Sequence, residues 1–263
     1  MTARKKYQML LVARKGRLGI VTLNRPEKRN ALSARLVAET LEALHELEDD
    51  AAVGVVIIKG AGNSFCAGHD LSELQGKSVR ELRPIFRKSL QLMEAISALK
   101  KPVIAAVHGY ATAMGCALAA GCDLAIAADD ALFQLPGAGR GAACISPAAV
   151  VGRFTGMRKC LEMVLTAEAI SADQAERAGL VNRVVPREEL DSAVEKLAEK
   201  LAGNAPIALQ MGKEAVYAMS GMERSQAYRY AVEMMSRNID TEDGREGIAS
   251  FLEKREPRPW KGR

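Results

Sequence analysis

The chain has 263 residues, of which 48% are hydrophobic and 26% charged, so it is long enough for one large or two small globular domains. Aromatic residues make up only 4%, which favours an α/β protein with close helix packing over an all-β sandwich. The net charge is +5, but the Lys and Arg residues are dispersed and no aromatic residues alternate with them, which argues against a nucleic-acid partner. A small, multiply charged anion such as a nucleotide phosphate suits this charge equally well.

The five cysteines are odd in number and form no Cys-x-x-Cys pair, so neither a disulfide framework nor a metal site is predicted. A reducing compartment fits this pattern. No apolar run approaches the ~20 residues of a membrane span, so no membrane association is expected. The basic first residues lack the apolar core of a signal peptide, and a strand expected almost at once leaves little room for a mitochondrial presequence. We therefore expect a cytoplasmic protein.

The amino-terminal half of the sequence alternates predicted strands and helices. Strands over 6–13 and 18–23 are separated by a short gap and predict a hairpin, and a helix starts at Ser33 after a polar turn. The β-branched run at 53–58 is typical of a buried parallel strand. Further along we expect a Gly-rich loop at 60–70, a helix at 79–99, a strand at 102–107, a helix start within 109–121, and strands at 122–127 and 132–133.

From Ser146 onward the pattern is mainly helical, and the strand–helix alternation before it predicts right-handed crossovers. Residues 203–205 are the expected hinge between an α/β core, residues 1–202, and a helical module, residues 203–263. Apolar stripes in that module predict core or subunit contacts. The expected elements are helices at 147–154, 158–165, 172–178, 187–201 and 206 to about 237, with a short strand at 180–185.

The most specific signal is a series of short motifs: NRP and NAL within 24–32, FCAGHDL at 65–71, KPVIAAVHGYA at 101–111, GCDL at 121–124, LT, ISA and AGLV within 165–181, and DGREG and FLEKR within 243–255. Each motif alone is weak. In this order, over almost the entire chain, they resemble the crotonase (enoyl-CoA hydratase/isomerase) superfamily. The chain is most similar to a divergent branch, the enoyl-CoA hydratase domain-containing proteins, which resembles it in lacking the catalytic glutamates.

The resemblance implies an α/β fold, a crotonase-type spiral of ββα repeats, with a C-terminal helical oligomerisation module. It implies a homo-oligomer, a trimer or a hexamer built as a dimer of trimers. It also implies an acyl-CoA thioester as the partner, lying across the two Gly-rich loops, with no cofactor beyond the coenzyme A of the substrate.

In such a site the thioester oxygen meets two backbone N–H groups. A thioester acidifies its α-carbon by delocalising charge onto its oxygen, so preorganised donors there stabilise the enolate. By position the donors are the N–H groups of His69 and Met114, and the adjoining Ala67, Gly68 and Gly115 let the backbone approach closely. Met114 stands where the family usually has glycine, so its side chain is expected to narrow or reshape the acyl pocket.

The phosphates of coenzyme A require basic side chains. By resemblance, Lys28 and Arg29 border the adenine and phosphates, and Lys254 reaches the 3′-phosphate of a ligand in a neighbouring subunit. Each of the three is equally well explained as a solvated surface charge.

Hydration of an enoyl thioester needs one group that activates water and another that supplies the α-proton, and paired carboxylates do this in the hydratases. The resemblance puts Ala117 and Gly137 at these two positions, where they border the substrate. Neither residue can transfer a proton, and residues 131–161 contain no Asp or Glu. The sequence therefore argues against true hydratase activity.

Other side chains are candidates for the missing chemistry. His69 is the strongest, because an imidazole titrates near neutrality, although its side chain can also point away and leave only its N–H in use. Asp70 is expected to hold the loop by accepting backbone N–H bonds. Cys144 and Ser146 lie in the right segment, but Cys144 needs its pKa lowered by a neighbour such as Arg140.

Three functions remain open from the sequence. The first is a lyase or isomerase acting on acyl-CoA, nominally an enoyl-CoA hydratase; decarboxylation is chemically attractive because it needs enolate stabilisation and no base. The second is a non-catalytic acyl-CoA-binding or scaffold protein. The third, a nucleic-acid binder, predicts a steep salt dependence of affinity.

Overall fold

The computed structural model describes residues 7–263. The basic cluster at Arg4, Lys5 and Lys6, and the start of the strand expected at 6–13, lie outside the described residues. β1 (Leu10–Lys15) and β2 (Leu18–Leu23) pair antiparallel, which confirms the predicted hairpin, with the first strand later than expected.

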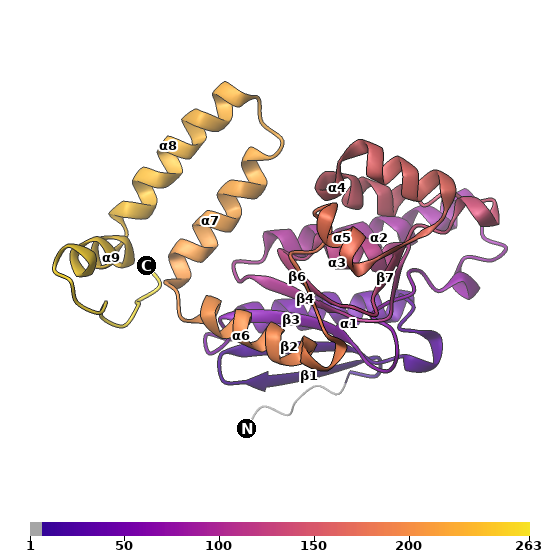
Figure 1. Ribbon diagram of the computed structural model, residues 1–263, viewed down its shortest axis with the longest axis horizontal. Coiled ribbons are helices and arrows are strands. Elements are labelled where there is room, and N and C mark those ends of the chain that lie inside the picture. Colours follow the sequence, from indigo (N-terminus) through magenta and orange to yellow (C-terminus); the bar gives the residue numbers. More distant parts are fainter. Residues whose placement is uncertain (1–6) are drawn as a thin grey trace.

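The main sheet has six strands in the order β1-β2-β3-β4-β6-β9, and all pairs after the first hairpin are parallel. Side chains alternate between its two faces, because successive residues of a strand point to opposite sides. One face packs on α6, and the other packs on the cluster that includes α1, α2 and α3 (Figure 1). The bounds are β3 (Val55–Gly60), β4 (Val103–Val107), β6 (Leu124–Ala128), β9 (Arg183–Val185), α1 (Ala34–Asp49), α2 (Val79–Ala98), α3 (Met114–Gly121) and α6 (Leu190–Ala202).

A second, three-stranded sheet contains β5 (Tyr110–Thr112), β7 (Leu132–Gln134) and β8 (Ala169–Ser171). Its strands follow those of the main sheet: β4 leads into β5 and α3, and β6 into β7 and α4 (Ile145–Thr166). These are the ββα repeats that the resemblance implied. The sequence reading missed β5 and β8, each three residues long, and the helix expected within 109–121 begins only at Met114.

The helices of the second half also depart from expectation in places. α4 spans both helices predicted at 147–154 and 158–165, and Gly156, with φ 73°, forms the break between them. α5 (Ala172–Arg177) is as predicted. Short 3-10 helices complete this list: Pro26–Lys28, Leu71–Glu73, Ala138–Arg140 and Arg187–Glu189.

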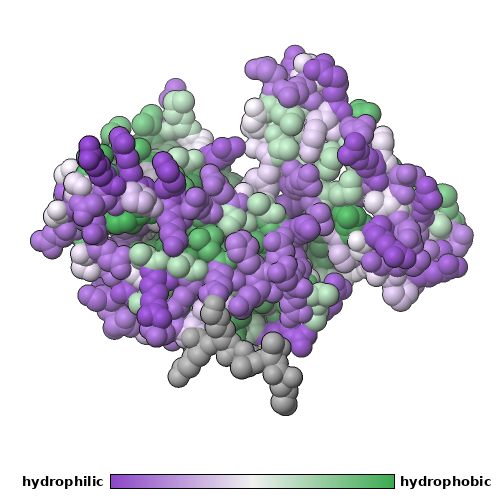
Figure 2. All heavy atoms as spheres, turned by 180° about the vertical axis from the view of Figure 1, so that it is seen from behind, coloured by the Kyte–Doolittle hydropathy of each residue, from purple (hydrophilic) through white to green (hydrophobic). Residues whose placement is uncertain are grey.

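Beyond residues 203–205 the chain forms a helical arm of α7 (Pro206–Met219), α8 (Arg224–Asp240) and α9 (Glu242–Leu252). The single helical run expected from 206 to about 237 is interrupted at 220–223, and α9 was not predicted. Figure 1 shows the arm standing apart from the core, and Figure 2 shows apolar surface on it. Its large exposed apolar side chains are Val216, Tyr228, Val232, Met235, Ile239, Ile248, Phe251 and Leu252.

Polar contacts from α7 fix the base of this arm to the core. The ammonium of Lys213 on α7 lies 2.7 Å from the carboxylate of Asp123, which also accepts the Tyr217 hydroxyl at 2.9 Å. Further along, the chain returns to the hinge, where the indole N–H of Trp260 donates to the carbonyl of Gly203 at 3.0 Å. No helix among residues 7–263 is long and apolar enough to cross a membrane.

Candidate active site

The first Gly-rich loop, residues 60–70, pairs directly with the second, residues 109–115, which contains β5 and the start of α3. The N–H of Cys66 donates to the carbonyl of Tyr110, and the carbonyl of Cys66 accepts the N–H of Thr112, both at 3.0 Å. A methyl group added at Gly115 would fall well inside van der Waals distance of the Cys66 carbonyl oxygen. At Gly68, where φ is +88°, it would crowd the Thr112 carbonyl oxygen at 2.8 Å. Glycine at these two positions lets the loops approach each other.

The first predicted donor, the N–H of His69, lies in a fixed stretch of backbone. The N–H of Leu32 donates to the carbonyl of Gly68 at 2.7 Å, and the carbonyl of Leu32 accepts the N–H of Asp70 at 3.0 Å. These bonds flank His69 on both sides. Its own N–H donates to no acceptor within residues 7–263.

The second predicted donor, the N–H of Met114, is at the start of α3, where backbone N–H groups have no partner inside the helix. The preceding Ala113 has φ 49° and ψ −120°, a rare conformation for a residue with a side chain, and its N–H donates to Gln134 at 2.8 Å. A methyl group on Gly68 would lie 3.0 Å from the Met114 nitrogen, so the two loops bring both predicted donors to adjoining segments. The Met114 side chain is fully buried in the core, and its effect on an acyl pocket stays a prediction.

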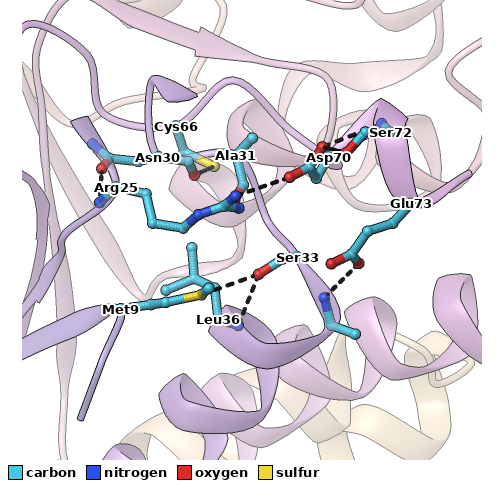
Figure 3. A network of polar contacts seen from close by, with 11 residues as sticks. Met9, Arg25, Asn30, Ala31, Ser33, Leu36, Cys66, Asp70, Ser72 and Glu73 are labelled. Carbon is cyan, nitrogen blue, oxygen red and sulfur yellow. Dashed lines mark hydrogen bonds and ion pairs between the residues drawn. The ribbon is translucent and has the colours of Figure 1, made fainter. Parts of the chain in front are cut away.

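Asp70 holds the first loop, as the sequence suggested (Figure 3). Its carboxylate accepts the hydroxyl of Ser72 at 2.6 Å and the N–H of the same residue at 3.2 Å, and it pairs with Arg25 at 2.9 Å. The Ser72 hydroxyl and the Arg25 guanidinium hold the pKa of this carboxyl below its usual value. The ionised form therefore stabilises the loop at neutral pH, and this contribution is lost as the pH falls through that lowered pKa.

Asn30 is a further positioning residue whose role the sequence reading missed. It is fully buried with φ 57°, a conformation that asparagine tolerates better than most residues. Its side-chain oxygen accepts the N–H of Arg25 at 2.9 Å (Figure 3). Its amide donates to the carbonyls of Ala61 at 2.9 Å and Ser64 at 2.7 Å. Its place in the NAL motif was the only signal for this role in the sequence.

The side chain of His69 is half-buried against α2. Its Nε2 lies 2.9 Å from the hydroxyl oxygen of Ser89, and its ring meets the ring of Phe86 edge to face at 5.2 Å. Burial lowers the pKa of His69 to about 4. The expectation that this imidazole titrates near neutrality is therefore wrong. At pH 7 it is neutral, so it has no acidic proton to give and is a weak base.

Cys144 does not meet the condition for reactivity. It is buried, and burial raises the pKa of its thiol, whereas a nucleophilic cysteine needs a lowered pKa. Arg140, the neighbour expected to lower it, is exposed at the end of a 3-10 helix. Ser146 follows as the second residue of α4. Burial therefore gives Cys144 the opposite pKa shift from that of an activated nucleophile.

Ala117 and Gly137, the two positions where the resemblance implies glutamates in a hydratase, leave little space for a larger side chain. Ala117, on α3, is fully buried in the hydrophobic core. At Gly137 an added methyl group would overlap the carbonyl oxygen of Ala142, whose N–H donates back to the carbonyl of Gly137 at 3.0 Å. The segment after Pro136 is therefore folded around the glycine.

We expect Gly137→Glu to lower the thermal unfolding temperature and to leave crotonyl-CoA hydration unrestored. Overpacking a filled site costs about 1–3 kcal/mol, and here the obstacle is backbone that other hydrogen bonds hold. Gly139→Glu is the matched control, because the nearest atom to an added Cβ there is the Cβ of Ala167 at 3.7 Å. Equal unfolding temperatures for the two variants, or hydration by the Gly137 variant, would contradict this account.

The predicted phosphate-binding residues are spread over two parts of the molecule. Lys28 is exposed, and the guanidinium of the adjacent Arg29 lies 5.3 Å from the ring centroid of Tyr110. The carbonyl of Arg29 accepts the N–H of Ala67 at 2.9 Å, which ties this segment to the first Gly-rich loop. Lys254 is exposed just after α9, in the helical arm. A surface hollow of about 300 Å³ is lined by Pro26, Arg29, Gly62, Asn63, Ser64 and Tyr110.

Comparisons with known proteins agree with this architecture. Residues 13–263 match the family model of enoyl-CoA hydratase/isomerase. The mitochondrial enoyl-CoA hydratase domain-containing protein 3 of Xenopus laevis is 37% identical over 90% of this chain and 81% of its own. Two solved structures each have a TM-score of 0.92: an enoyl-CoA hydratase of Mycobacterium smegmatis, 40% identical over 95% of this chain and 98% of its own, and human enoyl-CoA hydratase domain-containing protein 3, 33% identical over 96% and 100%.

The chain therefore belongs to the enoyl-CoA hydratase/isomerase family and has the crotonase fold. The resemblance drawn from its motifs, including the one to the enoyl-CoA hydratase domain-containing branch, is confirmed. Among residues 7–263, no group of three or more His, Cys, Asp or Glu side chains is arranged to hold a metal ion.

Proposed function

We propose that this protein binds an acyl-CoA thioester with its carbonyl oxygen against the N–H groups of His69 and Met114. The observation that carries the proposal is that these two N–H groups have no acceptor within residues 7–263 and lie on loops that glycines pack together. Two such donors stabilise the negative charge that an enolate places on the thioester oxygen. Lys28, Arg29 and Lys254 would bind the phosphates, and no cofactor beyond the coenzyme A of the substrate is needed.

Within this proposal, hydration is not the main reaction. Ala117 and Gly137 cannot transfer protons, His69 is neutral with a pKa of about 4, and the pKa of the Cys144 thiol is raised. A reaction that needs an oxyanion site and no base fits better. Loss of CO2 from a malonyl-type thioester is one: the C–C bond breaks, its electron pair becomes the enolate, and water supplies the α-proton.

The second candidate is a non-catalytic acyl-CoA-binding or scaffold protein. The specific observation in its favour is the same lack of an acid–base pair, since enolate stabilisation alone does not complete a proton transfer. In either case we propose a homotrimer or hexamer, because exposed apolar side chains on the helical arm would find cover in subunit contacts. A cytoplasmic location stays a prediction, and the relative from Xenopus laevis carries the word mitochondrial in its name.

The test is crotonyl-CoA turnover, read from the loss of enoyl absorbance, beside a calorimetric titration with butyryl-CoA. We expect saturable binding and a turnover at least about 10²-fold below that of the Mycobacterium smegmatis enoyl-CoA hydratase, because losing one general acid or base costs about 10²–10⁴. Binding with CO2 release from malonyl- or methylmalonyl-CoA supports the enzyme, and binding without any turnover supports the scaffold. Absence of butyryl-CoA binding would overturn both readings.

A further inference from the structure

A buried ion pair lies beside the first Gly-rich loop. The guanidinium of Arg25 and the carboxylate of Asp70 are 2.9 Å apart, and their side chains are only 12% and 10% exposed (Figure 3). Nη2 of the guanidinium makes this contact. The other terminal nitrogen, Nη1, donates to the backbone carbonyl of Ala31 at 2.6 Å, which is shorter than the usual N–H···O distance of about 2.9–3.0 Å. Arg25 therefore holds a positive charge against a backbone carbonyl in the segment that precedes α1.

The Ala31 carbonyl is connected to the N–H of His69 through two peptide groups. A peptide group is planar, so the Ala31 carbonyl and the Leu32 N–H lie in one plane. The Leu32 N–H donates to the Gly68 carbonyl at 2.7 Å, and that carbonyl shares the next plane with the His69 N–H. This series of hydrogen bonds begins at the Arg25 guanidinium and ends at a donor that has no acceptor within residues 7–263.

The series should fix both the direction and the strength of its last donor. Because each peptide group is rigid, holding its carbonyl limits the direction of its N–H. A hydrogen bond to the carbonyl also draws electron density through the peptide group, which strengthens the N–H as a donor by about 10–30% per hydrogen bond. The first donor here is charged, and charged donors form bonds roughly twice as strong as neutral ones. Burial adds to this effect, because it limits screening by water.

The second proposed donor has no charged group at the start of its hydrogen bonds. The N–H of Met114 shares its peptide group with the Ala113 carbonyl, and that carbonyl accepts the N–H of Ala117 at 3.2 Å. This is a neutral backbone bond in the first turn of α3, and it is longer than either bond of the series that leads to His69. The charge of Arg25 is therefore transmitted through these backbone hydrogen bonds to the His69 donor alone.

We propose that Arg25 is a positioning residue: through the peptide groups 31–32 and 68–69 it directs the His69 N–H towards the thioester oxygen and strengthens it as a donor. This inference rests on the proposed function, because it assumes that this N–H receives the substrate oxygen. Asp70 takes part by holding the guanidinium in place and balancing its charge. Arg25 acts through the backbone and needs no contact with the substrate, so its loss should change how strongly a bound carbonyl is polarised.

The experiment measures the infrared stretch of the thioester carbonyl in butyryl-CoA, isotopically labelled at that carbon, free and bound. Hydrogen bonding at the oxygen lowers this frequency. We expect a downshift on binding to the unmodified protein and loss of a large part of it in Arg25→Met. The remainder is retained because the Met114 N–H is still present. Arg25→Lys, whose ammonium keeps the charge and can still donate to the Ala31 carbonyl, is expected to show an intermediate downshift.

Arg17→Met is the matched control for Arg25→Met. Nη1 of Arg17 donates to the carbonyl of Ala202 at 2.7 Å, so this variant loses the same kind of hydrogen bond. The Arg17 carbonyl accepts the N–H groups of Gly54 and Val55 at the start of β3, whereas the first Gly-rich loop begins at the end of that strand. The downshift is therefore expected to remain complete in Arg17→Met.

The outcomes separate this inference from the proposed function. A full downshift in folded, ligand-bound Arg25→Met, or an equal loss in Arg17→Met, overturns the positioning role and leaves the oxyanion site intact. Absence of any downshift in the unmodified protein with bound ligand overturns the oxyanion site itself.

Arg25→Met leaves the Asp70 carboxylate buried and alone, which can prevent folding. In that case Arg25→Met is combined with Asp70→Asn, which removes both charges. We expect the double variant to show the same loss of downshift, and a full downshift in it would overturn the positioning role.

Discussion

Replacing Lys213 by methionine is expected to lower the free energy of unfolding by about 3–5 kcal/mol, the usual cost of leaving one member of a buried ion pair alone. The side chains of Lys213 and Asp123 are only 8% and 13% exposed, and their charged groups are 2.7 Å apart. The ammonium also donates to the carbonyls of Ile96 at 2.8 Å and Lys101 at 3.1 Å. Methionine removes all of these bonds and leaves a buried carboxylate, so the base of the helical arm is expected to loosen.

The decrease in the free energy of unfolding caused by Lys213→Met should depend on pH. Burial already raises the pKa of Asp123 and lowers that of Lys213, so both charges depend on their pairing and on the hydrogen bonds around them. Without Lys213 the pKa of Asp123 rises further. A carboxyl whose folded pKa exceeds its unfolded pKa destabilises the fold at high pH and ceases to do so once protonated. The difference between variant and parent should therefore shrink as the pH is lowered from 8 towards 5.

Chemical denaturation at these pH values provides the measurement. Lys15→Met is the control, because Lys15 pairs with Glu195 at 2.7 Å on the surface with 60% of its side chain exposed. Removal of such an exposed pair costs about 0–1 kcal/mol. Comparable decreases in the free energy of unfolding of the two variants would show that the buried Lys213–Asp123 pair stabilises the fold no more than an exposed pair.

Gly115→Ala is expected to separate the two Gly-rich loops and abolish acyl-CoA binding. The added methyl group would overlap the carbonyl oxygen of Cys66, the same oxygen that accepts the N–H of Thr112. Neither side is a flexible side chain, so relief requires backbone movement, and the destabilisation should reach or exceed the about 1–3 kcal/mol of ordinary overpacking. We expect the N–H of the adjacent Met114 to be displaced together with the backbone of residue 115.

Gly212→Ala supplies the comparison for Gly115→Ala. Both glycines are helical, but nothing lies within 4 Å of a Cβ built at Gly212 on α7. Alanine is about 0.8–1.0 kcal/mol better than glycine inside a helix, so Gly212→Ala should stabilise the protein. Equilibrium denaturation measures the stability of both variants, and titration with butyryl-CoA measures their ligand binding. If Gly115→Ala remains stable and binds ligand, the close approach of the loops is not what builds the site.

The sequence pattern predicted the long elements, whereas the ββα repeats were implied only by the resemblance of the motifs. β3 and β4 are runs of apolar residues buried on both faces, and α1 and α2 have a clear helical period, so local pattern was sufficient there. β5 and β8 were not predicted, because a three-residue strand is too short to show a periodic pattern and forms only by pairing with strands that are distant in the sequence. The helical arm was divided wrongly because its apolar residues follow one another across the turn at 220–223.

At the candidate site, the resemblance supplied the chain positions of the proposed donors but not the surroundings of the side chains. The pKa of His69 depends on packing against Phe86 and Ser89, which lie on a different element. Likewise, the closure at Gly137 depends on how the chain folds back at Ala142. Such properties depend on which residues the fold brings close in space, so a local sequence pattern cannot predict them.

The return of the chain end to the hinge has a spectroscopic consequence. Trp260 is the only tryptophan in the chain, and its indole N–H is bonded to Gly203 between α6 and α7. Intrinsic tryptophan emission therefore originates at one junction, far along the chain from both Gly-rich loops. A fluorescence melting curve of this protein reports detachment of the tail from that junction, whereas circular dichroism averages over all its helices.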